Sequence, residues 1–348
     1  MLTKRTLLSL IFGLLISGTA IADTINLNPD HPDRYVVVKG DTLWDIAGKF
    51  LRDPWLCPEI WNINPDIKNP HLIYPGDVIV LTFNEEGKPV LSVERAHEEP
   101  GKPTEKLSPQ VRVIELEKAI PTITPAVIKP FLEQPRVLTK KEYEDAPYIV
   151  AGEEKRLISG QSNQIYVRGL DENNGNLYTI VHIGEAYRSP GKRGILGYEA
   201  IHVGDAVVEA FGDPATLRIT ESDREALIGD RLLPVSEKPF EEHFLPHAPA
   251  KMVEGTIIGV RDAVSRVGRY QVVIIDLGEK DGMEVGDVLA VFQKGDTVRD
   301  IVEGGKKVTL PEREAGKMMV FRTFDQISYA LIMQAAHEIR LHDIVRNP

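Results

Sequence analysis

The chain has 348 residues, of which 42% are hydrophobic and 27% are charged, and its formal net charge at pH 7 is −11. This length is enough for two or three domains, and the composition excludes a chain that is disordered throughout. The negative charge disfavours binding to nucleic acid or to anionic lipid surfaces through bulk charge. Because Cys57 is the sole cysteine, a disulfide within the chain is excluded and stability must come from packing.

The first 22 residues follow the three-part order of a secretory signal peptide. Lys4 and Arg5 form a short basic start, residues 7–16 form an apolar run, and Ala-Ile-Ala at 20–22 forms a small-x-small cleavage site. The apolar run is short for a bilayer span, so we favour cleavage over an uncleaved membrane anchor. We therefore expect an exported protein whose charge falls from −11 to −13 with the loss of Lys4 and Arg5.

The first compact segment, residues 34–83, begins with a strand and a helix. Residues 34–38 are rich in β-branched residues and run into Gly-Asp at 40–41, a turn dipeptide. Thr42, with Asp45 three positions later, has the spacing of a capping box and places a carboxylate in the first turn of a helix. Apolar residues at i, i+3, i+4 and i+7 then form one helical stripe, which consists of Leu43, Ile46, Ala47 and Phe50.

A second helix and a second strand complete this segment. Pro58 suits the first turn of a helix that carries apolar residues at 60, 61 and 63 and ends before Pro65. Residues 74–77 (Tyr-Pro-Gly-Asp) form a turn that leads into an apolar strand at 78–81. The order strand, helix, helix, strand predicts an α+β domain in which two antiparallel strands carry both helices on one face.

Two motifs of this segment resemble the LysM domain. One is Tyr-x-Val-x-x-Gly-Asp-Thr-Leu-x-x-Ile-Ala at 35–47, and the other is Asn-Pro-His-Leu-Ile-Tyr-Pro-Gly-Asp at 69–77. The resemblance implies a shallow groove, between the loop after the first strand and the loop before the second, that holds N-acetylglucosamine-containing glycans of peptidoglycan. Matched residue by residue, the glycan-binding residues it implies are Gly40, Asp41, Thr42 and Leu43 on one wall and Leu72, Ile73 and Tyr74 on the other.

Several of these residues also have a purely structural interpretation. Asp41 and Thr42 can serve the helix cap alone, and Gly76 can serve the turn alone. The three tryptophans, at 44, 55 and 61, fit the core or a domain contact better than a sugar-stacking platform. Residues 51–58 are longer and more aromatic than the usual LysM connection, so the preferred length of glycan is left open.

Prolines recur throughout residues 84–147, at a density that blocks helices and most central strands. The alternation of apolar residues at 111, 113 and 116 indicates one local strand. Overall this composition predicts a semi-extended linker, which would let the first domain reach a cell wall at some distance from the rest of the chain.

Short β-rich runs separated by Gly, Asp and Asn follow from Tyr148 to the end of the chain. Several lack strict alternation, which is typical of strands covered on both faces or of a small barrel. A weak repeat relates residues 215–230 to residues 328–343 at an offset of 113 positions (343 − 230). We interpret it as two related β modules, 148–236 and 250–348, with chance similarity as the alternative. The predicted fold is multidomain: an α+β LysM domain, a linker and two small β-rich modules.

No catalytic, metal or cofactor site is predicted. Cys57 lies inside the LysM-like segment beside a proline, which does not suit an activated thiolate. His243 and His247 are separated by Phe-Leu-Pro and cannot share a helical face, and Glu221 lies in a polar turn. The remaining candidates fit structural roles, namely His182, His202, His337, His342 and the glycine-lysine turn at 304–307. We expect a protein that is not an enzyme and needs no cofactor.

The last module carries further motifs, Leu-Gly-x-x-Asp-Gly-x-x-x-Gly-Asp-Val at 277–288 and Gly-Lys-x-Met-Val-Phe-Arg at 316–322. With an N-terminal LysM domain, they resemble the secretin-associated TsaP family of type IV pili, whose C-terminal region is similar to the flagellar FlgT family. The resemblance implies a periplasmic protein, associated with peptidoglycan and the outer membrane, that anchors a secretin in the wall without catalysis. Its implied partners are peptidoglycan and the pilus secretin, with an oligomer around the secretin ring. A hydrolase accessory protein and a flagellar basal-body component are the alternatives.

Overall fold

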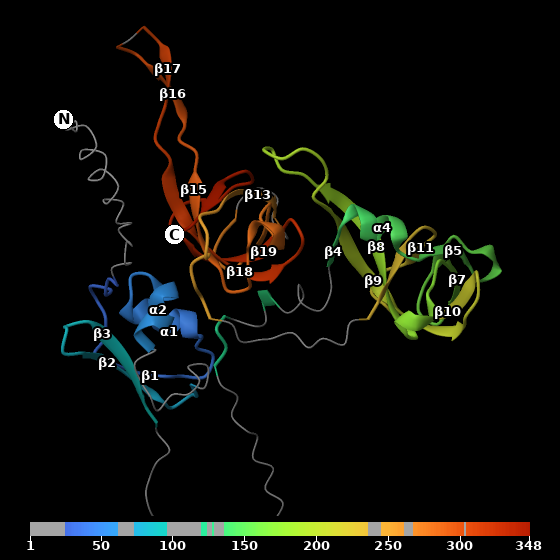
Figure 1. Ribbon diagram of the computed structural model, residues 1–348, viewed down its shortest axis with the longest axis horizontal. Coiled ribbons are helices and arrows are strands. Elements are labelled where there is room, and N and C mark those ends of the chain that lie inside the picture. The colour runs from blue at the N-terminus through green and yellow to red at the C-terminus, as the bar shows by residue number, and fades with distance from the viewer. Residues whose placement is uncertain are drawn as a thin grey trace, which may run out of the picture.

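The computed structural model describes residues 25–61, 73–95, 120–123, 127–128, 136–235, 245–260, 267–302 and 304–348. Three folded units stand out, drawn blue to cyan, green to yellow, and orange to red in Figure 1. The predicted signal peptide at 1–22 and the predicted strand near 111–116 lie outside the described residues. Among the helices of the described residues, none is long and apolar enough to cross a membrane.

The first unit contains the predicted order of strand, helix, helix and strand. Its elements are β1 (Arg34–Val36), α1 (Leu43–Phe50), the 3-10 helix η1 (Pro54–Leu56), α2 (Cys57–Trp61) and β2 (Val78–Phe83). β1 and β2 pair antiparallel, with Tyr35 opposite Ile79. The predicted apolar stripe of α1 lies in the core, because all four of its residues are buried, and Trp44 is buried with them.

A third strand, β3 (Pro89–Glu94), extends this sheet into the segment that was predicted to be a linker. It pairs antiparallel with β2 along its whole length. The side-chain Oδ1 of Asn84 sets the turn between them by accepting the backbone N–H groups of Glu86 and Lys88. The linker prediction was wrong here because Pro89 stands at the first position of an edge strand, where a proline is tolerated.

The second unit, residues 136–235, is a seven-stranded sheet with the order β10-β7-β5-β12-β8-β9-β4. β10 also pairs with β9, so six strands close into a ring and β4 is added at β9. The unit begins before the predicted start at 148, because β4 and α4 belong to it. Its elements are β4 (Arg136–Leu138), α4 (Lys140–Asp145), β5 (Tyr148–Gly152), η2 (Glu153–Lys155), β6 (Ile158–Ser159), β7 (Gln164–Arg168), η3 (Glu172–Asn174), β8 (Leu177–Tyr187), β9 (Gly197–Ala210), β10 (Ala215–Ser222), β11 (Ala226–Leu227) and β12 (Arg231–Pro234).

The third unit is a closed six-stranded barrel with the order β13-β14-β19-β18-β15-β20. A two-stranded hairpin, β16–β17, projects from it between β15 and β18 (Figure 1). The elements are β13 (Glu254–Val260), β14 (Val272–Ile275), η4 (Glu279–Asp281), β15 (Val288–Gln293), β16 (Thr297–Asp300), β17 (Lys306–Thr309), β18 (Arg313–Thr323), β19 (Ser328–Ala335) and β20 (Ile344–Arg346).

The two β units share one strand order. The offset of 113 positions maps Ala215, the first residue of β10, onto Ser328, the first residue of β19, and it maps Arg231 of β12 onto Ile344 of β20. β10 lies between β7 and β9 as β19 lies between β14 and β18. In the same way, β12 lies between β5 and β8 as β20 lies between β13 and β15. The weak sequence repeat therefore coincides with a repeated six-stranded topology.

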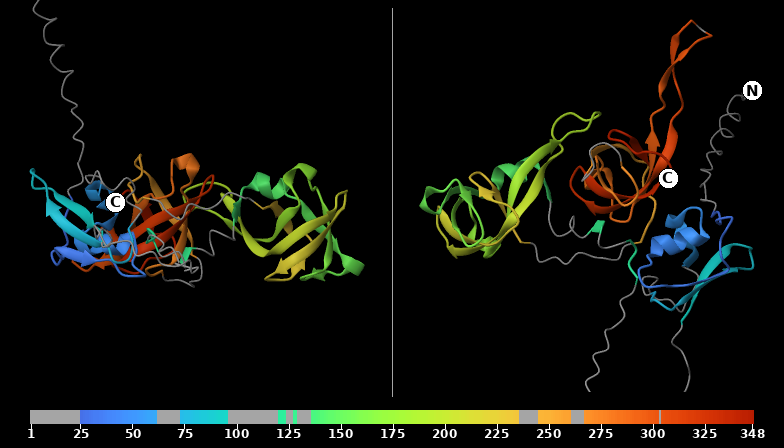
Figure 2. Two further views of the ribbon diagram at one scale, coloured as in Figure 1. Left: turned by 90° about the horizontal axis from the view of Figure 1, so that it is seen from below. Right: turned by 180° about the vertical axis from the view of Figure 1, so that it is seen from behind.

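The barrel lies between the first and the second unit (Figures 1 and 2). Buried residues of the first unit and of the barrel form one continuous hydrophobic cluster, which includes Phe50, Met319 and Tyr329. From the second unit, Lys192 Nζ donates a hydrogen bond of 2.6 Å to the carbonyl oxygen of Asp276 in the barrel. The first unit is thus packed against the barrel. A long extended spacer would instead have separated the two.

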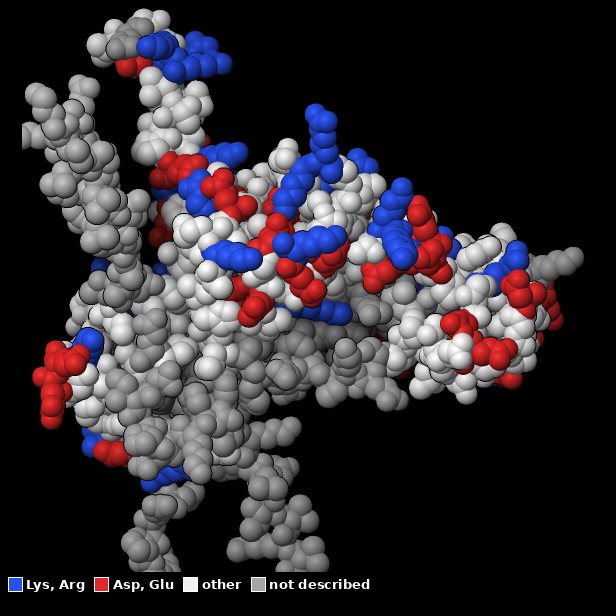
Figure 3. All heavy atoms as spheres, viewed as in Figure 1, with Lys and Arg blue, Asp and Glu red and all other residues white. Residues whose placement is uncertain are grey.

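Acidic and basic side chains are interspersed over the viewed face of the barrel and the second unit (Figure 3). Basic side chains also mark the end of the projecting β16–β17 hairpin. This face therefore has no broad patch of purely positive or purely negative charge, although the chain carries a net negative charge.

Candidate functional site

A glycine and an aspartate shape the loop after β1. Gly40 has a φ of +102°, a left-handed conformation that favours glycine. A Cβ at this position would meet no atom within 4 Å, so backbone conformation and not space selects the glycine. The Asp41 carboxylate accepts hydrogen bonds of 2.9 Å from the Val38 N–H and the Tyr35 hydroxyl. Burial, and then the bond to Asp41, raise the pKa of Tyr35.

Thr42 caps α1, as predicted. Its Oγ1 accepts the Asp45 N–H at 3.1 Å, and its backbone carbonyl accepts the Ile46 N–H at 3.0 Å. The predicted capping box takes a different form, because the Asp45 carboxylate accepts the Thr42 hydroxyl proton at 2.8 Å. The N–H groups of the first helical turn have no acceptor within the helix, so those of Leu43 and Trp44 require partners from elsewhere in the chain.

The loop before β2 is held against the first loop by backbone bonds. Gly76 N–H donates to the Val37 carbonyl, and Val37 N–H donates to the Asp77 carbonyl, both at 2.8 Å. The Asp77 carboxylate accepts the Tyr74 N–H at 3.0 Å and so closes the turn. Of the predicted residues on this wall, Ile73 and Tyr74 are therefore brought to the first loop, whereas Leu72 lies outside the described residues.

Residues 120–123, which we call the inserted segment, take the two open N–H groups of α1. The Leu43 N–H donates to the Pro121 carbonyl oxygen at 3.0 Å, and the Trp44 N–H donates to the Thr122 carbonyl oxygen at 3.3 Å. The first turn of a helix carries a partial positive charge, which favours carbonyl oxygens at this place. The inserted segment thus completes the cap of α1.

The inserted segment also bonds to the second loop. The Ile120 N–H donates to the Ile73 carbonyl oxygen at 2.8 Å. Ile120 and Ile123 are only 3% and 2% exposed, and both belong to the same hydrophobic cluster as Leu43 and Ile73. Sequence reasoning placed these residues in the linker, and the only local signal against that was the pair of isoleucines within a proline-rich stretch.

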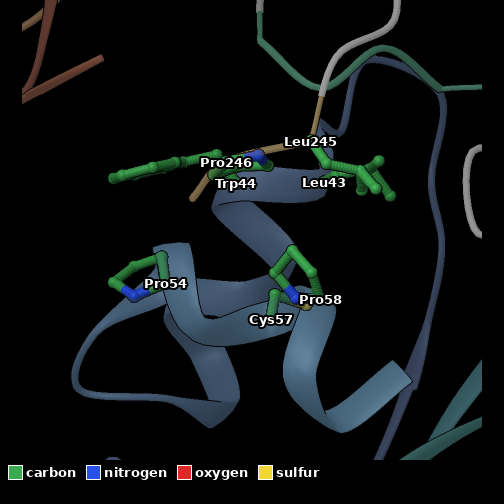
Figure 4. A pocket seen from close by; sticks show the side chains of 7 residues that line it. All are labelled: Leu43, Trp44, Pro54, Cys57, Pro58, Leu245 and Pro246. Carbon is green, nitrogen blue, oxygen red and sulfur yellow. The ribbon is translucent and has the colours of Figure 1, made fainter. Parts of the chain in front are cut away.

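Trp44 and Trp55 are core residues. Trp44 is 2% exposed and Trp55 is 6% exposed, so neither offers a sugar-stacking face. Leu245 and Pro246, which precede the barrel, lie over α1 beside Leu43 and Trp44 (Figure 4). They line a small apolar pocket together with Pro54, Cys57 and Pro58. The start of the barrel therefore covers part of the wall to which Leu43 belongs.

The other candidate residues are dispersed. Cys57 is buried, Glu221 is exposed at the end of β10, and His243 lies outside the described residues. Within the described part of the chain, no three His, Cys, Asp or Glu side chains gather as a metal site would require. Three histidines contact carboxylates: His182 contacts Asp230, His247 contacts Asp287, and His202 contacts both Asp205 and Asp223.

Comparison with known proteins assigns the first unit. The family model described as LysM domain matches residues 35–82, which contain both loops, the helices between them and most of the two flanking strands β1 and β2. Residues 35–82 are a LysM domain. LysM domains bind the N-acetylglucosamine-containing glycans of peptidoglycan, and the presence of one here supports carbohydrate binding by the chain.

One relative resembles only part of the chain. YqbP of Bacillus subtilis (strain 168) is 44% identical over 60 residues, which cover 14% of this chain and 27% of YqbP. The chain thus matches about a quarter of the length of this relative. The LysM part of the predicted fold is confirmed, and it is followed by a β-rich region that contains a six-stranded barrel.

Proposed function

We propose that the protein is a non-catalytic peptidoglycan anchor whose LysM domain holds N-acetylglucosamine-containing glycan. The observation that carries the proposal is the LysM match, which covers the loop after β1 and the loop before β2. An acetamido group has one N–H donor and one carbonyl acceptor. The Ile73 carbonyl can accept the first, and the Leu43 and Trp44 N–H groups can donate to the second.

The proposal assigns binding and not cleavage to this chain. The thiol of Cys57 lies in the core of the LysM domain, 6% exposed, where a nucleophile would have no access to substrate. Glu221 lies opposite Asp205 in the β10–β9 ladder, and its side chain is exposed. Both residues therefore support a structural role better than a catalytic one.

The wider role we propose is to anchor an outer-membrane secretin of the type IV pilus in the cell wall. The resemblance of the C-terminal motifs to the TsaP family supports this partner, and the signal-like N-terminus supports export to the periplasm. The two β units would supply the protein contact, since they carry most of the surface outside the LysM domain. Several copies around a secretin ring would then strengthen a weak single glycan contact.

Sedimentation with purified sacculi tests the glycan role. The mature protein should pellet with sacculi, and an excess of N-acetylglucosamine pentamer should release it. Deletion of residues 34–82 should abolish pelleting, provided that circular dichroism shows the β units still folded. Equal pelleting of the intact and the shortened protein would refute the role of the LysM domain. Release of soluble muropeptides by the purified protein would refute the absence of catalysis.

Crosslinking in cells tests the secretin partner. A photo-crosslinking amino acid can replace Ile301, which lies at the end of the projecting hairpin and is 92% exposed. We expect capture of the secretin from this position or from a second one on the outer face of β9. Capture of a flagellar basal-body protein or of a wall hydrolase instead would favour the corresponding alternative.

A further inference from the structure

We propose that the inserted segment, residues 120–123, is an internal occupant of the glycan groove, so that glycan binds only when this segment is displaced. The inference rests on the proposed glycan function. It starts from the position of the segment, which bonds to both loops that the LysM motifs assign to the groove. The family match ends at residue 82 and does not extend to these residues.

The segment uses the donors that a glycan would need. An N–H group has a single hydrogen, so the Leu43 N–H cannot serve the Pro121 carbonyl and an acetamido carbonyl at the same time. The same holds for the Trp44 N–H, which is bonded to Thr122. The carbonyl oxygens of the segment therefore stand in for the acetamido oxygens of a sugar. Binding of the two occupants is mutually exclusive at these atoms.

The apolar walls are also covered, by the isoleucines of the segment and, over Leu43, by Leu245 and Pro246. Leu43 is 9% exposed and Ile73 is fully buried, so neither side chain is open to a sugar face in this state. Ile120 and Ile123 supply apolar surface that is itself almost completely buried. Removal of both isoleucines from water stabilises the occupied state. The occupant is held by main-chain bonds and by burial, not by charge.

Because the occupant is part of the same chain, its effective concentration at the groove is constant and independent of protein concentration. The apparent affinity for glycan is the intrinsic affinity multiplied by the fraction of molecules with an open groove. An open fraction of about 1% would weaken glycan binding about 100-fold. Any event that withdraws the segment would raise affinity by the same factor, which makes wall attachment conditional.

The decisive experiment compares the intact mature protein with the variant I120D/I123D. Two buried carboxylates would expel the segment from the groove, while both loops keep their sequence. We expect the affinity for N-acetylglucosamine pentamer, measured by calorimetry, to rise at least about 10-fold. The pentamer is neutral, so the added charge does not itself attract it. The matched control is I301D/V302D, in which the same charge is added at side chains that are 92% and 96% exposed; its affinity should not change.

Amide hydrogen exchange, measured by NMR, provides a readout that needs no variant. In the intact protein the Ile120 amide should be protected, and saturating pentamer should remove that protection because its acceptor loop is taken by the sugar. Binding of pentamer with the Ile120 amide still protected would overturn the inference, as would equal affinities of the intact and the I120D/I123D protein. If the variant loses protection at Leu43 and Trp44 but neither protein binds pentamer or sacculi, the occupied groove stands and the glycan function fails.

Discussion

Asp45 and Arg269, 224 positions apart in the chain, form an ion pair between the LysM domain and the barrel, with Arg269 Nη2 at 2.5 Å from Asp45 Oδ1. The Tyr270 hydroxyl donates to the same carboxylate oxygen at 3.1 Å. Asp45 also accepts the hydroxyl proton of Thr42, the residue that caps α1. One carboxylate thus connects the first turn of α1 to the barrel.

A double-mutant cycle measures this connection. Asp45→Asn and Arg269→Gln should each lower the free energy of unfolding, and their coupling energy should be about 0.5 kcal/mol, because both side chains are partly exposed. The coupling should fall when salt is raised, since exposed pairs are screened. Urea unfolding at two salt concentrations gives both quantities. A coupling of zero at low salt would mean that the pair does not hold the domains together.

Gly204 of β9 and Gly316 of β18 occupy corresponding places in the two β units. A Cβ on Gly204 would collide with the Glu221 carbonyl oxygen, and a Cβ on Gly316 would collide with that of Gln334, which lies 113 positions after Glu221. We expect Gly204→Ala and Gly316→Ala each to cost about 1–3 kcal/mol in thermal unfolding. Gly160→Ala is the control, because a Cβ there meets nothing within 4 Å; its effect should stay within about 0.5 kcal/mol.

The raised pKa of His247 predicts that the free energy of unfolding depends on pH. Its hydrogen bond to Asp287, opposed by burial and supported by the nearby Glu284, raises the pKa of His247 above 6.5. A raised folded-state pKa means that the protonated ring stabilises the fold fully below about pH 6.5, and that this contribution is lost as pH rises through the folded-state pKa. Urea unfolding between pH 5.5 and about 8.5 should show this decline in the intact protein.

His247→Asn should remove that part of the decline, whereas His337→Asn, at an exposed position, should leave it in place. An unchanged pH profile in the His247 variant would show that another group is responsible. Because Pro246 and Leu245 lie over the LysM domain (Figure 4), we also expect the indole fluorescence of Trp44 to follow the same titration.

Thr42 has a structural role as the cap of α1 and a proposed role in glycan binding, and a matched residue separates the two. Thr42→Ala should cost about 1 kcal/mol through loss of the cap, and it should also weaken pentamer binding, because the cap orders the Leu43 and Trp44 N–H groups. Thr139 caps α4 in the second unit in the same way, with Glu142 completing its capping box. Thr139→Ala should therefore cost a similar stability with no loss of pentamer affinity, as measured by calorimetry. Equal losses of affinity would point to global destabilisation.

Local sequence patterns predicted much of the structure of the first unit. The turn dipeptide at 40–41, the cap at Thr42 and the apolar stripe of α1 are each encoded within a few residues, and each appears in the structure. The density of prolines was a poorer predictor, because it led us to expect a linker where the chain forms β3. The pairing of β3 with β2 depends on the Asn84 turn and on the alternation of apolar residues that follows Pro89.

The sequence by itself determined the LysM domain, the turns that open α1 and precede β2, and the repeat that became two six-stranded units, because turn chemistry, capping and strand composition act between near neighbours. Only the tertiary structure decided which residues bond to these two loops and which part of the chain packs against the LysM domain. The bonds from Leu43 and Trp44 to residues 121 and 122, and the pair of Asp45 with Arg269, join positions far apart in the chain. Such contacts depend on the geometry of closed sheets and shared cores, which leaves no mark in any local pattern.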